Sequence, residues 1–243
     1  NFTVNEALLY IKSDNKFMEN ADYLKSVSIF SDLMESERIF IANKMVLSSY
    51  SKGDIILMED TEGKHCFFIF NGSVKITRSN ENGREVILAI ITEGDFFGEM
   101  ALLDGESRSA NVMALEDTKV LGLNKIDFMN MLEDYPKVSI QLLKELTIRL
   151  RKSDQQIASL TLSDAEKRVG LCILRLAIEQ GTIKKGHVKI NTFPFQQDIA
   201  NMAGTSRETV SRTLVFLEHN GFILRQGRTL KIINYVKFQK QFD

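Results

Sequence analysis

The order of apolar and polar residues along the chain changes character near Tyr50 and again near Pro136. Residues 5–48 have the spacing of short helices, with the clearest apolar face over 36–47. From Tyr50 onward, glycines recur about every ten residues and separate short runs rich in β-branched and aromatic residues. These runs lie at 54–58, 66–70, 73–78 and 85–91. Such punctuation is typical of an all-β sandwich or barrel that ends near Leu123.

A hairpin is expected between the last two of these runs, where Asn82-Gly83 stands. Asn and Gly both tolerate positive φ, which a tight two-residue turn needs.

Helical spacing returns after the β-rich part, first over 126–132 and then in a long helix that Pro136 opens. In the long helix an apolar residue, replaced once by serine, recurs alternately every three and every four positions, as in a coiled-coil seam. The seam consists of Leu143, Leu146, Leu150, Ser153, Ile157 and Leu160. We interpret it as a dimer contact; packing within one subunit is the alternative. A further amphipathic helix is expected over 165–180, ending at Gly181.

A helix, a glycine-containing turn and a second helix follow near the C-terminus, at 196–203, Gly204 and 205–214. This order is typical of a helix-turn-helix, whose second helix enters the major groove of DNA. The runs 223–225 and 229–233 then predict a short hairpin, or wing.

Several polar residues of this region have the chemistry to contact DNA. Arginine can donate two hydrogen bonds to guanine, and glutamate can accept from cytosine. Ser206 and the first-turn amides can hold a phosphate. Thr205-x-x-Glu208 also fits a capping box, in which Glu208 would only close the helix start. The expected DNA-binding residues are Gln197, Ser206, Arg207, Glu208, Thr209, Arg212 and Arg228.

The charge distribution favours two domains. The 243 residues carry a net charge of −1, but residues 1–180 sum to −7 and residues 181–243 to +6. Only the second part is therefore expected to attract a polyanion, although an uneven solvated surface would look the same.

The few cysteines and histidines narrow the chemistry further. Two cysteines without a CxxC and three scattered histidines exclude a disulfide framework and a cysteine-ligated cluster within one chain. We expect no metal, heme or Fe-S cluster, no membrane partner and a cytoplasmic location.

Two segments resemble motifs of the CRP/FNR family of bacterial transcription regulators. Gln197-Asp198-Ile199-Ala200, followed by residues 204–212, resembles the family's recognition motif. Residues 94–103, followed by Arg108-Ser109-Ala110, resemble its phosphate-binding cassette. The resemblance implies an α+β fold with an N-terminal double-stranded β-roll of jelly-roll type, a long dimerisation helix and a C-terminal winged helix-turn-helix. The implied domains span 1–134, 135–163 and 164–243.

The same resemblance implies a cyclic-nucleotide site. Arg108 and Ser109 would hold the phosphate, Glu99 would accept the ribose 2′-hydroxyl, and two adjacent polar residues on the dimer helix would contact the base. Asp154 departs from the family's serine at the second of these positions. The alternative is an internal Glu99–Arg108 salt bridge in a roll that binds no nucleotide. The expected ligand-binding residues are Gly98, Glu99, Met100, Ala101, Arg108, Ser109, Ser153 and Asp154.

Taken together, these features predict a cAMP-responsive homodimer, joined through residues 136–162, that binds pseudo-palindromic DNA and works with RNA polymerase. The alternatives are a regulator of the same fold with another effector (a cyclic dinucleotide, a redox or gas signal), or DNA binding without an effector. A pure nucleotide-binding module is disfavoured by the helix-turn-helix. An enzyme is disfavoured because the sequence shows no nucleophile–base pair, metal cluster or phosphate-loop lysine motif.

Overall fold

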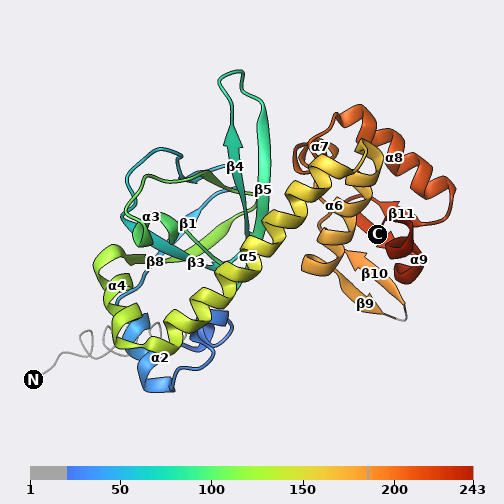
Figure 1. Ribbon diagram of the computed structural model, residues 1–243. Coiled ribbons are helices and arrows are strands. Elements are labelled where there is room, and N and C mark those ends of the chain that lie inside the picture. Colours follow the sequence, from blue (N-terminus) through green and yellow to red (C-terminus); the bar gives the residue numbers. More distant parts are fainter. Residues whose placement is uncertain (1–20, 185, 243) are drawn as a thin grey trace, which may run out of the picture. The chain divides into compact units, whose positions relative to one another are not determined.

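The computed structural model describes residues 21–184 and 186–242 and divides the chain into two compact units (Figure 1). The first combines residues up to Arg78 with Leu88–Leu150, and the second combines Ser79–Ile87 with the residues from Arg151 onward. The short helices expected over residues 5–20 lie outside the described residues. The predicted domain boundaries at 134 and 163 stay predictions.

The first unit is built on the predicted β-roll, which consists of two four-stranded sheets. Their strand orders are β1-β8-β3-β6 and β2-β7-β4-β5, so strands distant in sequence become neighbours. Phenylalanines of β3 and β6 pack on one another in two pairs, Phe67 with Phe97 and Phe68 with Phe96, and each pair belongs to a different apolar cluster. The strands are β1 (Val46–Tyr50), β2 (Ile55–Leu57), β3 (His65–Asn71), β4 (Ser73–Ser79), β5 (Glu85–Thr92), β6 (Phe96–Phe97), β7 (Asn111–Ala114) and β8 (Thr118–Asn124).

Helices cover the roll and share its core. The short helix η1 (Ser28–Phe30) and α2 (Glu35–Ala42) precede the roll, α3 (Met100–Leu103) lies within it, and α4 (Lys125–Asp134) follows it. Buried side chains from η1, α2, β3, β8, α4 and the start of the next helix form one apolar cluster. The cluster includes Phe96 of the edge strand β6, and residues 98–103 follow this strand in the chain.

One expected helix needed new bounds, and one expected hairpin is confirmed with a different turn. The helix expected over 36–47 ends at Ala42, and Val46 instead begins β1, where it pairs with Gly122 of β8. Pairing with a distant strand thus overrides the helical spacing of this short segment. The hairpin at Asn82-Gly83 is confirmed, but only Gly83 has positive φ, at 73°.

The long helix α5 runs without a break over Pro136–Leu162, as predicted (Figure 1). Leu143, Leu150 and Ile157 of the seam are exposed, whereas Leu146 packs partly against the core of its own unit. Within the described residues, no helix combines the length and apolarity that crossing a bilayer requires.

The second unit contains the predicted winged helix-turn-helix. The helices α6 (Ala165–Gln180), α7 (Gln196–Ala203) and α8 (Arg207–His219) pack together, and Gly204 makes the turn with φ 59°. The wing strands β11 (Ile223–Gln226) and β12 (Thr229–Ile232) extend a sheet of order β11-β12-β10-β9.

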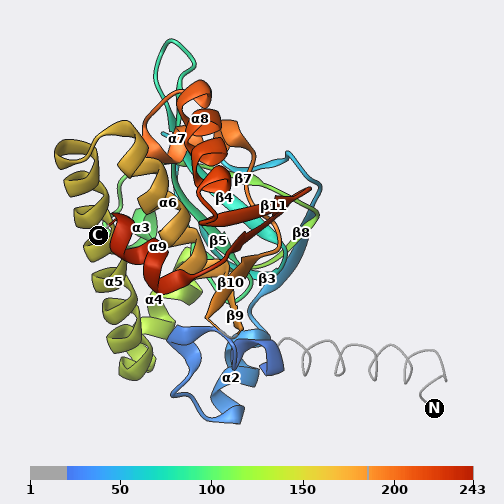
Figure 2. The ribbon, with the colours of Figure 1, turned by 90° about the vertical axis from the view of Figure 1, so that its right-hand side faces the viewer.

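Three elements of this unit have no counterpart in the sequence analysis: β9 (Thr182–Lys184), β10 (His187–Ile190) and α9 (Tyr235–Phe242). Helix α9 packs against α6 (Figure 2). A Cβ on Gly170 would lie 2.2 Å from the Phe242 ring, so this glycine lets α9 approach closely.

Candidate functional site

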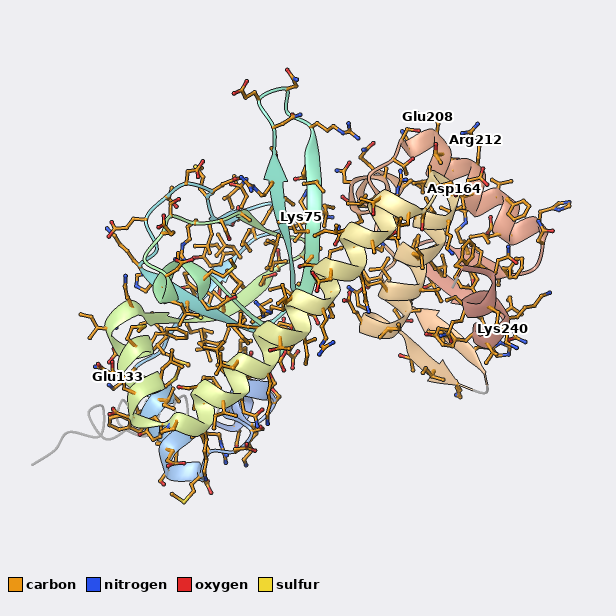
Figure 3. The ribbon with its side chains drawn as sticks, viewed as in Figure 1. Lys75, Glu133, Asp164, Glu208, Arg212 and Lys240 are labelled. Atoms are coloured by element: carbon orange, nitrogen blue, oxygen red, sulfur yellow. The ribbon has the colours of Figure 1, made fainter. Side chains whose placement is uncertain are left out.

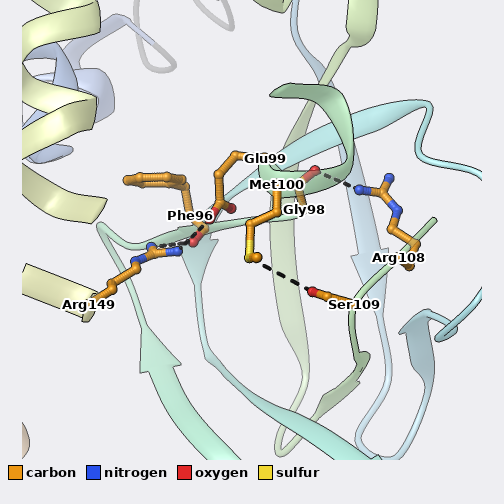
Figure 4. Close-up of polar contacts among 7 residues, drawn as sticks. All are labelled: Phe96, Gly98, Glu99, Met100, Arg108, Ser109 and Arg149. Carbon is orange, nitrogen blue, oxygen red and sulfur yellow. Dashed lines mark hydrogen bonds and ion pairs between the residues drawn. The ribbon is translucent and has the colours of Figure 1, made fainter. Parts of the chain in front are cut away.

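A buried arginine lies at the centre of the cassette in the first unit. Arg108 is only 4% exposed. Its Nη1 donates to the carbonyl oxygen of Gly98 at 2.6 Å (Figure 4). Its Nη2 donates to the carbonyl oxygen of His65 at 2.7 Å. Its Nε has no hydrogen-bond partner among the described residues.

No carboxylate of the described residues forms a salt bridge with Arg108. Burial lowers the pKa of this guanidinium, while Cys66 and Glu99 act in the opposite direction. An arginine nevertheless keeps its proton in proteins, so the site holds a desolvated positive charge whose direct contacts are two backbone carbonyl oxygens. Such a site favours an anion that can accept two parallel hydrogen bonds.

Gly98 shapes the backbone beside this charge. Its φ is 84°, in the region that side chains with a Cβ rarely adopt. A Cβ here would lie 2.9 Å from Nη1 of Arg108 and 3.2 Å from the carbonyl oxygen of His65. Glycine is therefore required for the approach that brings the carbonyl of residue 98 to the guanidinium.

The second predicted ligand residue, Glu99, is 3% exposed and forms an ion pair with Arg149 of α5. Nη1 of Arg149 lies 2.9 Å from Oε1 of Glu99, and its Nη2 donates to the carbonyl of Phe96 at 2.7 Å (Figure 4). The guanidinium also lies over the Phe96 ring, at 4.3 Å. The Glu99–Arg108 salt bridge considered from the sequence does not form: Glu99 pairs with Arg149, and Arg108 donates to the backbone carbonyls of Gly98 and His65.

The sequence analysis missed Arg149. One signal was available: Arg149 precedes Ser153 by four residues, which places both on one side of a helix. Its pairing with Glu99 links the cassette directly to α5 within the first unit.

The remaining cassette residues lie around the same segment. Ala101 is buried. A Cβ added to Gly63 would lie 2.6 Å from the Cβ of Ala101, so the two residues are in close contact. Met100 is exposed, and its sulfur lies 3.8 Å from Oγ of Ser109. Helix α3 is a single turn, shorter than a strong helix dipole needs.

Ser153 and Asp154 are exposed on α5, in the part assigned to the second unit. Their role toward a base stays a prediction.

In the helix-turn-helix, Ser206 caps α8 by accepting from the backbone N–H of Thr209 at 3.2 Å. The helix therefore begins one residue later than the Thr205-x-x-Glu208 capping box requires. The pKa of Glu208 is lowered by its own backbone N–H and by the Ser206 hydroxyl. Glu208 and Arg212 project from the exposed side of α8 (Figure 3), and Arg207 is exposed at its start.

The other expected DNA contacts are more constrained. Gln197 donates to the side chain of Asn201 at 2.9 Å. The Arg228 guanidinium lies 4.7 Å from the centre of the Phe195 ring, so it is held against the start of α7. A further wing cation, Arg225, pairs with Glu218 at 2.5 Å and lowers the pKa of that carboxyl.

Comparisons with known proteins match both the cassette region and the helix-turn-helix region. The family model of the cyclic nucleotide-binding domain matches residues 47–135, and that of the Crp-like helix-turn-helix domain matches residues 167–240. The cyclic AMP receptor protein of Thermus thermophilus is 32% identical over 209 residues, which cover 86% of this chain and 94% of that protein.

Two further proteins show the same likeness. The CRP-like cAMP-activated global transcriptional regulator of Mycobacterium tuberculosis is 28% identical over 211 residues, which cover 87% of this chain and 94% of that protein. The solved structure of a CooA mutant from Carboxydothermus hydrogenoformans superposes with a TM-score of 0.71 at 26% identity, covering 83% of this chain and 89% of that one. The chain therefore belongs to the CRP/FNR family of bacterial transcription regulators, with a cyclic nucleotide-binding domain and a DNA-binding helix-turn-helix.

Proposed function

We propose that this regulator is a homodimer that responds to cAMP and, when the nucleotide is bound, recognises pseudo-palindromic DNA. The observation that carries the proposal is Arg108, a buried cation with no carboxylate ion pair among the described residues. The names of two relatives, which describe cAMP-activated and cAMP-binding regulators, favour this effector.

The phosphate of the nucleotide would bind at Arg108 and Ser109. A phosphate offers the two acceptor oxygens that a guanidinium fork matches, and its charge compensates the buried cation. In binding, Arg108 would exchange its bonds to the carbonyls of Gly98 and His65 for stronger charge-assisted ones. Met100 and Ala101 would line the site beside them.

The ribose 2′-hydroxyl would donate to Glu99. This carboxylate has acceptor capacity left beyond its bond to Arg149, because each of its two oxygens can accept more than one hydrogen bond. A ligand bound here would therefore act on the same ion pair that ties the cassette to α5. This shared carboxylate supplies the differential contact that allosteric coupling requires.

The base would reach Ser153 and Asp154, by resemblance to the family. Asp154 accepts but cannot donate a hydrogen bond, and its charge repels an anionic ligand. For this reason a cyclic dinucleotide is the second candidate.

Isothermal titration of the full chain with cAMP, cGMP and cyclic di-GMP tests the effector. We expect cAMP to bind with at least ten-fold higher affinity than the other two. Replacing Asp154 by serine should strengthen cAMP binding several-fold by removing the like charge. Tighter binding of cyclic di-GMP, or no binding of any nucleotide, would contradict the proposal.

In the DNA complex, two copies of α8 would enter successive major grooves, roughly 34 Å apart. By resemblance, the half-sites would be TGTGA-like, and Gln197, Ser206, Thr209 and Arg228 would hold the backbone. RNA polymerase would be the partner at promoters, and no catalytic role is proposed. We also propose the division into effector domain (1–134), dimer helix (135–163) and DNA-binding domain (164–243).

Replacing Arg207 by alanine is expected to relax base preference at one position of each half-site. Loss of one bidentate contact to guanine costs about 1–3 kcal/mol. Selection from random duplexes, followed by binding measurements at one fixed salt concentration, provides the readout. Arg151→Ala, at an exposed arginine of α5, is the matched control and should leave the preference intact. An unaltered preference in the Arg207 variant would mean that this side chain is merely solvated.

A further inference from the structure

The second half of α8 exposes two apolar side chains that the DNA contacts proposed above do not use. Val215 is 58% exposed and Phe216 is 55% exposed. They border a shallow hollow on the helix surface, which is lined by Ser211, Arg212, Val215, Phe216, His219 and Asn220. Single exposed apolar residues are common, but an adjacent pair beside an expected DNA contact calls for an explanation.

The periodicity of the helix places Val215 on the side that bears the polar residues already assigned to DNA. Val215 follows Glu208 by seven residues, which is close to two turns, and follows Arg212 by three. The opposite side of α8 is buried in the domain core through Val210, Leu214 and Leu217. Val215 therefore faces whatever Glu208 and Arg212 face.

The chemistry of the exposed side changes along the helix. Its first two turns carry Arg207, Glu208 and Arg212, which can hydrogen-bond to base edges. The third turn offers a valine, which gains nothing from a phosphate. In the major groove, the one apolar group that a base presents is the C5 methyl of thymine. Val215 fits this group and does not fit the sugar–phosphate backbone.

We propose that Val215 is a specificity-determining residue that contacts the C5 methyl group of a thymine in each half-site, with Phe216 shielding that contact from water. Along the helix, Val215 lies about 10 Å from Glu208, so the thymine belongs to a base pair other than the one that Glu208 reads. This inference rests on the DNA binding described under the proposed function, but not on the identity of the effector.

The experiment removes the methyl group from either side of the contact. The wild-type chain first selects its site from random duplexes, with and without cAMP. Each thymine of that site is then replaced by uracil, which differs only in lacking the C5 methyl, and affinities are measured at one salt concentration. The same series is repeated with Val215→Ala, with Val215→Thr, which retains one methyl, and with Val236→Ala. Val236 is an exposed valine of α9 and is the matched control.

For the wild type, we expect uracil at one position per half-site to weaken binding about four-fold, the effect of removing one buried methylene-sized group. The loss should vanish in Val215→Ala, be smaller in Val215→Thr and persist in Val236→Ala. Alanine is the strongest helix former, so Val215→Ala should stay folded, which thermal unfolding verifies.

Two different failures are distinguishable. A wild-type chain that selects a site yet shows no uracil effect, or shows the same effect in Val215→Ala, overturns the role of Val215 alone. A wild-type chain that selects no sequence under either condition overturns the proposed function as well.

Discussion

The Arg108→Ala variant is expected to lose its response to cAMP while keeping the folded roll. Truncating one side of a buried charge pair in a complex costs about 2–5 kcal/mol, a fall in affinity of roughly 30-fold to several thousand-fold. The alanine cannot donate to the phosphate. Among the described residues of the roll, no other cation donates to the carbonyls of Gly98 and His65, so none stands ready to replace Arg108. Isothermal titration measures the loss directly, and cAMP-dependent DNA binding should disappear with it.

Arg108 also bonds to two backbone carbonyls, so the variant must be separated from simple unfolding. Arg108→Lys supplies this control, because it keeps the charge but removes the planar fork. We expect it to bind cAMP weakly, between the wild type and the alanine variant. Arg84→Ala, at an exposed arginine in the β4–β5 turn, should bind like the wild type. Normal activation of Arg108→Ala with a normal melting curve would contradict the phosphate assignment.

The second large effect is expected from Leu150→Lys, which introduces a charge into the seam of α5. Leu150 is 62% exposed in the single chain, so the substitution leaves the core of the chain intact. In a coiled-coil contact, the lysine would bury its charge against the apolar residues of the partner helix. Sedimentation should then show the 27.7 kDa chain instead of a particle of about twice that mass.

A second exposed apolar residue tests whether any new surface charge has this effect. Ile126 of α4 is 73% exposed and lies outside the seam, so Ile126→Lys should remain a dimer. DNA binding should fall together with dimerisation, because each half-site alone supplies only part of the contacts. If Leu150→Lys sediments as the wild type does, the seam is not the dimer contact.

Local patterns in the sequence were sufficient for most of the elements. The glycine spacing predicted β3 and β4 to within a residue or two, and the helix-turn-helix pattern predicted α7 with its observed bounds. The helix expected over 165–180 is observed as α6 with these bounds, and Asp164 caps it by accepting from the N–H of Lys167. In each case the signal lies within the segment itself, as side-chain periodicity or as a cap.

What the sequence could not show depends on contacts between distant segments. Strand β1 forms because Val46 pairs with Gly122 on β8, and no pattern within residues 46–50 predicts this distant partner. The Arg149–Glu99 pair likewise requires α5 to pack against the cassette, 50 residues away in sequence. The ligand and DNA roles of the named residues stay predictions.

The ion pair between Arg149 and Glu99 constrains how α5 can move. Arg149 and Leu150 are adjacent on one unbroken helix, and successive side chains are about 100° apart around its axis. A turn of α5 that carried Arg149 away from Glu99 would rotate Leu150 by the same angle and so shift the surface offered to a second copy. Whatever breaks or tightens this pair would therefore also reorient Leu150 at the proposed subunit contact, because both residues belong to the same rigid helix.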